Sequence, residues 1–151
     1  MEPVSFVSAD FGVPSGLSTE LFVLEPLGAR HNESDLAAWS SSIEHIQATP
    51  GLVGWGWPTR VYTLAENESD LVRHAADFAE RKGFTYTVLD PATREVIGCL
   101  YLYPSRRDGF DVHARSWVRA DRASLDKSLY DAVTRWLAES WPFRNPEYAQ
   151  R

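Results

Sequence analysis

The stretch that decides the fold has three segments, Phe84-Thr-Tyr-Thr-Val-Leu-Asp90, Pro91-Ala-Thr93 and Glu95-Val-Ile-Gly-Cys-Leu-Tyr-Leu-Tyr103. The first and third segments are rich in β-branched and aromatic residues, which are typical of strands. The segment between them is short and contains a proline, as a tight connection between two strands requires. The sequence therefore predicts a β-hairpin, and a third strand is predicted over Asp111–Arg119.

A helix is predicted after the third strand, from about Ser124 to Ser140. Apolar residues recur there at spacings of three and four, namely Leu125, Leu129, Val133, Trp136 and Leu137. Asp121 or Ser124 is placed to cap the first amides of this helix. A strand that runs into a helix N-terminus leaves N–H groups pointing at solvent, where a phosphate can bind. The order of elements therefore suggests a cradle for a coenzyme.

Two further helices are predicted nearer the N-terminus. The first covers about His31 to Thr49, with Asn32 as its cap and with a core-facing set of Leu36, Trp39, Ile43 and Ile46. The second covers about Thr63 to Lys82, with Thr63 and Glu66 in the capping-box relation and an apolar stripe of Leu71, Ala75 and Phe78. Residues 1–19 are expected to form an irregular arm that packs through Phe6, Val7 and Phe11.

With these elements in this order, the sequence resembles the GNAT superfamily, the acyl-CoA-dependent N-acyltransferases. The resemblance extends back through the segment Glu20–Leu27 and covers roughly Glu20 to Tyr148. It implies an α+β (α/β) fold, with one mixed, mostly antiparallel sheet of about five strands and three flanking helices. We expect this fold to form a single domain over residues 1–151. The implied activity is transfer of an acetyl group from acetyl-CoA to a small amine.

The resemblance also places the coenzyme. In the family, the pyrophosphate lies on an Arg/Gln-x-x-Gly-x-Gly/Ala turn, and the matching positions here are residues 122–127. Arg122 fits that pattern, whereas Leu125 and Lys127 replace the glycines and Asp126 adds a negative charge. The residues expected to hold the pantetheine are Ser116, Trp117, Val118 and Arg119, and those expected to hold the phosphates are Arg122, Ala123, Ser124 and Lys127.

The sequence departs from the family again near its C-terminus. The family's fifth strand is normally followed by another helix and two more strands, whereas this sequence stops at Arg151. We therefore expect a C-terminally shortened version of the fold, in which the residues from Arg144 onward supply one strand at most. No residue inherits the role of the family's general-acid tyrosine, because Tyr148 comes too early. An open sheet edge in this region predicts a homodimer.

The segment Gly51–Pro58 places two tryptophans among glycines. Such a loop can carry rigid rings over a small ligand, and in the family the corresponding connection borders the acceptor substrate. Residues predicted to contact substrate are Trp55 and Trp57, together with Glu44 and His45 before them. Two alternatives stay open, because the tryptophans can instead anchor the loop in the core and Glu44 and His45 can instead solvate a helix end.

His113 is the candidate catalytic residue. By the period-two alternation of a strand it shares one face with Asp111, Arg115 and Trp117. In a GNAT-like fold this strand lies beside the acyl thioester, so His113 could take a proton from the amine. The alternative is a set of polar pairs on a partly exposed strand. His31 is expected to precede a helix start and His74 to lie on an exposed surface, and neither has partners at metal-ligand spacing, so no metal is predicted.

The composition of the sequence argues against some classes of protein, among them nucleic-acid-binding and membrane proteins. The formal net charge of −6 argues against nucleic acid as a partner and mildly favours cationic substrates such as amines. No apolar run approaches the length of a membrane span, and the first residues lack the pattern of a signal peptide, so a cytoplasmic protein without membrane association is expected. Cys99 is the single cysteine and lies in an apolar strand, which indicates a buried, inert thiol.

Two functional hypotheses remain at this stage. The first is a GNAT-like N-acetyltransferase that uses acetyl-CoA as co-substrate. The second is a GNAT-like module that has lost catalysis and binds a small ligand or a protein partner under the tryptophan loop. The glycine-free turn and the short C-terminus favour the second hypothesis, while the strand-to-helix order favours the first.

Overall fold

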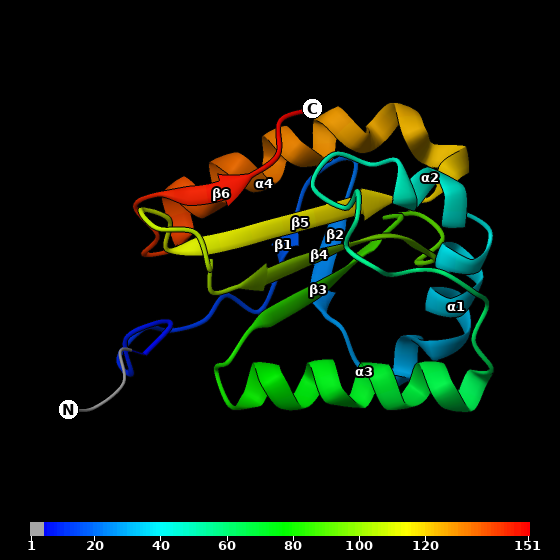
Figure 1. Cartoon of the computed structure of the whole chain (residues 1–151), viewed down its shortest axis with the longest axis horizontal. Helices are drawn as coiled ribbons and strands as arrows, with labels where there is room; N and C mark the ends of the chain where they lie inside the picture. The colour runs from blue at the N-terminus through cyan, green and yellow to red at the C-terminus, as the bar shows by residue number, and fades with distance from the viewer. Residues whose placement is uncertain (1–4) are drawn as a thin grey trace.

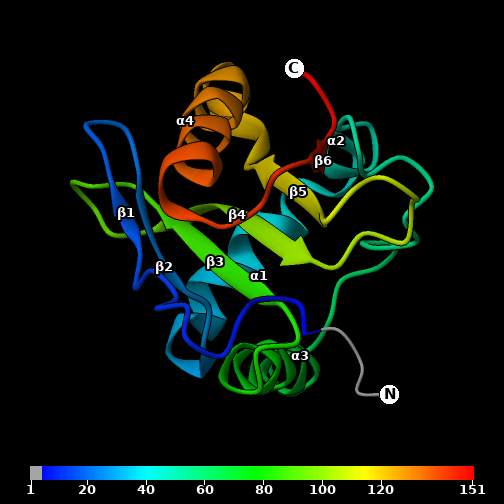
Figure 2. The ribbon, with the colours of Figure 1, turned by 90° about the vertical axis from the view of Figure 1, so that its left-hand side faces the viewer.

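The computed structural model describes residues 5–151. In that range the strands form one curled sheet whose order follows the chain, so each strand lies beside its sequence neighbours (Figure 2). The strands are β1 Leu17–Ser18, β2 Val23–Pro26, β3 Phe84–Leu89, β4 Val96–Tyr103, β5 Val112–Val118 and β6 Pro146–Tyr148. Neighbouring strands are antiparallel, except that β5 and β6 are parallel. The prediction of a mixed, mostly antiparallel sheet is confirmed.

The helices lie on both faces of the sheet. They are α1 Asn32–Ser40, α2 Ile43–Gln47, α3 Leu64–Ala79 and α4 Asp126–Ser140, and two 3-10 helices cover Ala29–His31 and Ala120–Leu125. Figure 1 places α4 on one side of the sheet and α3 on the other, with α1 near α3 (Figure 1). The described residues thus contain one strand and one α-helix more than the sequence predicted. The additional strand is the two-residue β1, which lies in the arm of residues 1–19 that was expected to be irregular.

Strand alternation divides the core into two parts. In β4, Ile97, Leu100 and Leu102 face the core beneath α4, while Cys99 and Tyr101 face the core beneath α1 and α3. On the first side they meet the buried residues of α4, which are Leu129, Val133, Trp136 and Leu137, as the sequence predicted. Cys99 is buried as predicted, and burial raises the pKa of its thiol well above the ordinary value, which disfavours the reactive thiolate.

The predicted helix from His31 to Thr49 is wrong as a single element, because the chain leaves helical geometry at Ser42 and α1 and α2 are separate helices. Serine hydroxyls compete there for backbone groups. Ser41 Oγ donates to the carbonyl of Ala38 at 3.0 Å, and Ser42 Oγ accepts from the amide of Ala120 at 2.8 Å. Asn32 is not the cap either, since its side-chain amide donates to the carbonyl of Leu64 at 2.9 Å.

The helix predicted from Thr63 is confirmed in its start and corrected at its end. Glu66 N donates to Thr63 Oγ1 at 3.1 Å and Thr63 N donates to Glu66 Oε1 at 3.0 Å, which is the capping box. The helix ends at Ala79 rather than Lys82. The predicted surface position of His74 is wrong, because its side chain lies against the sheet and is only 8% exposed.

The segment that leads into α4 also differs from the prediction. The 3-10 helix Ala120–Leu125 precedes it, and α4 itself begins at Asp126 rather than Ser124. Neither Asp121 nor Ser124 caps α4, whose cap position is Leu125 without a side-chain hydrogen bond.

β6 is the one strand predicted after Arg144, and it lies at the edge of the sheet. Dimerisation through this edge stays a prediction. Every helix within residues 5–151 is too short or too polar to cross a lipid bilayer.

Candidate functional site

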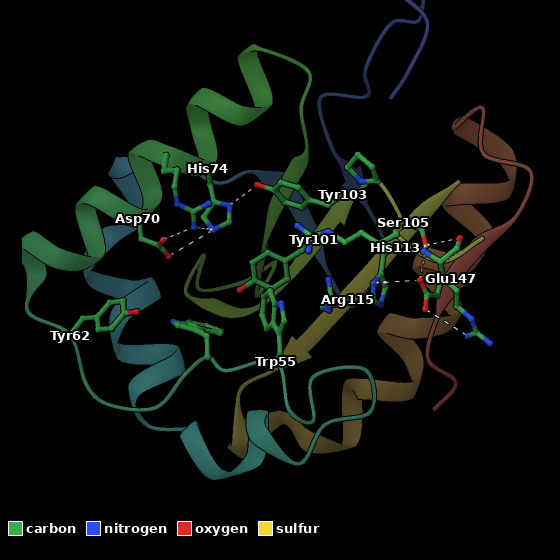
Figure 3. A pocket seen from close by; sticks show the side chains of 15 residues that line it. Trp55, Tyr62, Asp70, His74, Tyr101, Tyr103, Ser105, His113, Arg115 and Glu147 are labelled. Atoms are coloured by element: carbon green, nitrogen blue, oxygen red, sulfur yellow. Dashed lines mark hydrogen bonds and ion pairs between the residues drawn. The ribbon is translucent and has the colours of Figure 1, made fainter. Parts of the chain in front are cut away.

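A cavity of about 1090 Å³ opens on the face of the sheet that α3 covers (Figure 3). Its walls come from α3, the C-terminal end of β4, the loop after β4, and the parallel pair of β5 and β6, while the tryptophan loop of residues 51–58 closes one side. This volume suits a small organic ligand. Five aromatic side chains line it, namely Trp55, Trp57, Tyr62, Tyr101 and Tyr103.

The two tryptophans of the loop play different structural roles. Trp57 is half-buried and its ring centroid lies 5.2 Å from that of Trp39 and 6.3 Å from that of Trp117, both in the core. Trp55 lies 5.1 Å from Tyr101 but stays 36% exposed. Trp57 therefore anchors the loop, which is the alternative left open from the sequence, and Trp55 presents a ring to the cavity. Contact of either residue with a substrate stays a prediction.

His113 lies on the wall of the cavity beside a carboxylate that sequence analysis did not connect with it. The register of the parallel pair places His113 of β5 opposite Glu147 of β6, with His113 Nδ1 3.5 Å from Glu147 Oε1. Ser105 Oγ donates to the same oxygen at 2.8 Å. Burial, and then the charge of Arg115, lower the pKa of His113 from its ordinary 6.5. The imidazole is therefore neutral at neutral pH and can accept a proton.

Asp111 does not share the face of His113, contrary to the expected alternation. It lies just before β5, where its two carboxylate oxygens accept from the amides of Arg144 and Asn145 at 2.6 and 3.1 Å. These bonds hold the turn that leads into β6. The strand alternation begins only at Val112, so Arg115 and Trp117 do share the face of His113.

His74 is a site residue that sequence reasoning placed on the surface. Its Nδ1 lies 2.9 Å from Thr85 Oγ1 and 3.2 Å from the hydroxyl of Tyr103, which donates to Asp77 at 2.8 Å. Burial and the neighbouring Arg73 lower the pKa of His74. The signal that could have found it is the helical stripe, because His74 follows the buried Leu71 by three positions.

Glu44 and His45 lie on α2, away from the cavity. Glu44 is exposed, and His45 is half-buried with its Nε2 unpartnered among the described residues. Neither residue lines the cavity beneath the tryptophan loop. Their contact with substrate stays a prediction, without support from the cavity's geometry. Across residues 5–151, His, Cys, Asp and Glu side chains nowhere gather in threes as metal ligands would.

Comparison with known proteins gives a match in structure alone. No family model matches this sequence, and no curated protein does. Among solved structures, the acetyltransferase MccE, which confers self-immunity to a microcin and was solved with acetyl-CoA and AMP, superposes with a TM-score of 0.64 at 14% identity. A GCN5-related N-acetyltransferase from Brucella melitensis superposes with a TM-score of 0.63 at 20% identity. The ribosomal-protein-S5-alanine acetyltransferase from Vibrio fischeri gives 0.62 at 12% identity.

The chain has the GNAT fold. These alignments cover 84%, 87% and 81% of this chain, in the order given. They cover 67%, 57% and 66% of the three acetyltransferases, so the chain spans about two thirds of the length of two of them and less of the third. At these identities the likeness defines the fold, and the reaction has to be argued from the residues.

The residues predicted to hold the pantetheine lie in the second half of β5 and just after it, and in the structure they contact other groups of the protein. Ser116, Trp117 and Val118 are fully buried, and Arg119 donates through Nε to Asp121 at 2.6 Å. The register between β5 and β6 ends at the pair Ala114 and Tyr148. Beyond it, Arg151 Nη2 donates to the carbonyl of Ser116 at 2.6 Å.

The turn expected to hold the coenzyme phosphates is also engaged. Arg122 Nη1 donates to Asp90 Oδ2 at 2.9 Å, and Lys127 Nζ donates to Asp131 Oδ2 at 3.0 Å. The amide of Arg122 donates to the carbonyl of Arg119, so it is not free for a phosphate. Asp126 pairs with Arg151 at 2.7 Å. Ala123 and Ser124 are exposed. This conformation therefore fits acetyl-CoA poorly, and binding requires these pairs to open.

Proposed function

We propose that this GNAT-fold protein is an N-acyltransferase that moves an acetyl group from acetyl-CoA to the amine of a small molecule held in the cavity. The observation that carries the proposal is the position of His113, which lines the cavity where β5 and β6 are still paired. Its lowered pKa favours the neutral imidazole that a general base requires. The likeness to solved acetyltransferases supports it, and one of these, MccE, was solved with acetyl-CoA and AMP. Acetyl-CoA would supply the acyl group as a thioester.

The residues of the cavity would prepare the amine. A bound ammonium has to lose a proton before it can attack a carbonyl carbon. With the Nδ1 proton of His113 directed at Glu147, which lies 3.5 Å away, Nε2 is the nitrogen that takes this proton. Glu147 would keep the ring oriented and stabilise the imidazolium. Trp55 and Tyr101 would exclude water from the amine.

The coenzyme side of the proposal rests on the residues predicted from the sequence. Ser116, Trp117, Val118 and Arg119 would follow the pantetheine, and Arg122, Ala123, Ser124 and Lys127 would surround the phosphates. Arg122 has to exchange Asp90 for a phosphate, which replaces one charge-assisted contact by another. The exchange leaves the number of such contacts unchanged, so the paired state does not by itself prevent binding.

The proposal is tested by measuring thiol release from acetyl-CoA with a panel of small amines. We expect His113→Gln to lower kcat by about a hundred-fold or more, which is the usual contribution of a general base. Acetyl-CoA affinity should stay near that of the parent. In the parent, the acid limb of the pH–rate profile should lie below 6.5, because the pKa of His113 is lowered. A parent that turns over no amine, or a His113→Gln variant as active as the parent, would contradict the proposal.

A second candidate function is favoured by one observation. Arg151 is only 3% exposed and spans from Asp126 to the carbonyl of Ser116, across the region where the coenzyme is expected. A protein in which this contact persists would bind a small ligand in the cavity without acyl transfer. A thermal-shift series with acetyl-CoA separates the two functions, because a bound ligand raises the melting temperature once its concentration exceeds Kd. No shift at millimolar acetyl-CoA would favour the binding module.

The remaining expectations, about partners, location and metal ions, are also proposals. A small amine as substrate, a cytoplasmic location, a homodimer, and independence from nucleic acid, membrane and metal ions are all untested. Light scattering after size-exclusion chromatography tests the dimer directly, and a clean monomer would remove it. A chelator that abolishes activity would overturn the prediction of metal-free catalysis.

A further inference from the structure

Two hydrogen-bond donors of the cavity have no acceptor anywhere in residues 5–151. They are Arg115 Nε and the indole Nε1 of Trp57, and both atoms are buried. Buried polar atoms are nearly always paired in native proteins, so unpaired ones call for an explanation. No buried acceptor atom of a lining residue is unpaired in the same range. Both atoms are closed to solvent in this conformation, so an acceptor on a ligand would reach them only after a small shift of the two side chains.

The guanidinium of Arg115 is the charged member of this pair. The other arginines around the cavity are either paired with a carboxylate or exposed to solvent. Arg73 pairs with Asp70 at 2.6 Å, and Arg107 lies 3.8 Å from Glu147. Arg106 is exposed at the rim. Arg115 makes no ion pair and no hydrogen bond through its side chain within the described residues. Burial lowers the pKa of Arg115; the Glu147 carboxylate acts against this lowering and Arg106 adds to it. The net lowering means that the charge of Arg115 is only partly compensated, and a bound anion would stabilise it further.

An aromatic platform lies beside this charge. The Cζ of Arg115 lies 5.1 Å from the centroid of the Trp55 ring, a cation–π distance. Stacking on Trp55 fixes the plane of the guanidinium, whose two terminal nitrogens make no hydrogen bond within residues 5–151 and can donate to a bidentate acceptor. Trp55 is itself 36% exposed and meets Tyr101 edge to face. A flat ring can cover the exposed part of this surface (Figure 3).

We propose that the cavity binds a small ligand in which one anionic oxygen group is joined to a planar ring, with the anion on Arg115 and the ring against Trp55. The anion is a carboxylate or a phosphate. If the protein is the acyltransferase proposed above, this ligand also carries the amine. Its substrate would then be an amine that has both a planar ring and an acidic group. Binding of the ligand does not itself depend on acyl transfer.

Calorimetric titration in the absence of acetyl-CoA tests this inference with two matched pairs of probes. Tryptophan and tryptamine share a ring and an amine and differ in the carboxylate, while AMP and adenosine differ in the phosphate. We expect the anionic member of at least one pair to bind about ten-fold more tightly or better, since a charge-assisted contact contributes that much. The pair that shows the preference identifies the anion. Equal affinity within both pairs, or no binding of any probe at millimolar concentration, would overturn the inference.

Two variants decide whether Arg115 is responsible. Arg115→Met keeps the apolar stem and removes the charge, so it should abolish the preference for the probe that carries the carboxylate or phosphate. The affinity for the uncharged probe adenosine should stay nearly unchanged. Arg73→Met removes a charge from the same cavity, but that charge is already paired with Asp70, so the preference should remain. A preference that survives in Arg115→Met would overturn the assignment. Near-ultraviolet circular dichroism checks the fold of both variants, and the comparison of probes on the parent needs neither of them.

These measurements distinguish the inference from the proposed function. Binding of an anionic probe with no thiol release would leave the ligand class intact and remove the acyltransferase. Turnover of amines with no preference for those that carry a carboxylate or phosphate would leave the acyltransferase intact and remove the ligand class.

Discussion

The carboxyl group of Asp35 lies in the core between α1 and α3 and is 4% exposed. Its Oδ2 accepts from Asn67 Nδ2 at 3.1 Å, and Asn67 Oδ1 in turn accepts from the indole of Trp39 at 3.1 Å. Burial raises the pKa of Asp35 to about 6, against the lowering effect of the bond from Asn67. The folded state therefore binds this proton more tightly than the unfolded state, whose pKa is 3.8. The stability linked to the proton is present below pH 3.8 and is lost as the pH rises through about 6.

We expect Asp35→Asn to stabilise the protein at neutral pH. The amide removes the buried charge and keeps an oxygen that can accept from Asn67, so the gain should be about 3 kcal/mol at most. The gain should shrink as the pH falls toward 4, because the parent carboxyl is then protonated as well. Urea unfolding at the two pH values measures both quantities. A gain of equal size at both, or a loss at neutral pH, would show that the carboxylate is needed.

Gly98 gives a second test at the scale of one residue. A Cβ added there would lie 2.5 Å from the backbone oxygen of Trp117, on the neighbouring strand β5. Because this oxygen belongs to the backbone of the sheet, it cannot move aside cheaply. Gly98→Ala should cost about 1–3 kcal/mol of stability, the usual range for overpacking. Gly12→Ala is the control, since nothing lies within 4 Å of the added atom. Equal melting temperatures for the two variants would contradict the argument.

At the scale of elements, the connection between α2 and α3 controls the cavity. Gln47 Nε2 of α2 donates to the carbonyl of Pro58 at 2.8 Å, at the end of the tryptophan loop. Trp57 then anchors the loop in the core, and the capping box of Thr63 begins α3, which carries His74 into the cavity. The helix α3 is held along its length by the buried Asn67, Leu71 and His74, whereas the exposed part of the loop around Trp55 rests on the ring of Tyr101. A ligand therefore enters more readily past Trp55 than past α3.

Thr63→Ala removes half of the capping box and should destabilise the protein by about 1 kcal/mol. Thr59→Ala, in the same exposed loop, should have little effect on stability, because Thr59 takes part in no capping interaction. Urea midpoints of both variants give the comparison. Hydrogen exchange of the first turn of α3 should accelerate in Thr63→Ala alone. If both variants unfold at the midpoint of the parent, the capping box contributes nothing measurable.

At the scale of the whole molecule, Arg151 joins three parts of the GNAT fold that are distant in sequence. It holds the tail after β6 to the carbonyl of Ser116 in β5 and to Asp126 at the start of α4. The hydroxyl of Tyr148 lies 2.5 Å from Ser116 Oγ in the same place. The region that is expected to receive the pantetheine is thus closed by contacts across the whole chain.

Arg151→Ala should lower the stability by about 2 kcal/mol, because it leaves Asp126 without its partner. Acetyl-CoA should bind this variant more tightly than the parent if the coenzyme replaces Arg151 beside Ser116. Arg144→Ala, an exposed arginine shortly before β6, serves as the control for charge. Calorimetry with acetyl-CoA on the three proteins gives the comparison. Unchanged or weaker binding in Arg151→Ala would place the coenzyme, if it binds, elsewhere.

The amino-acid sequence by itself determined the order of strands from Phe84 to Val118, the capping box of α3 and the buried face of α4. These features follow from alternation, helical spacing and capping, which involve residues only a few positions apart. The same local signals failed at Ser41 and Ser42, where the hydroxyls compete with the helix backbone. They also failed at His74, whose charged neighbours in sequence concealed its position on the inner face of α3.

Only the tertiary structure decided what the cavity contains. His113 meets Glu147 through a parallel pairing of strands that are 34 residues apart, and the sheet places Arg115 beside Trp55 of the loop. Arg151 reaches Ser116 across 35 residues. None of these pairs has a local pattern, because the distance between two such residues is set by the packing of the complete sheet and its helices. The sequence therefore determined most of the elements and their order. The tertiary structure determined which side chains face one another and which charge has no partner within residues 5–151.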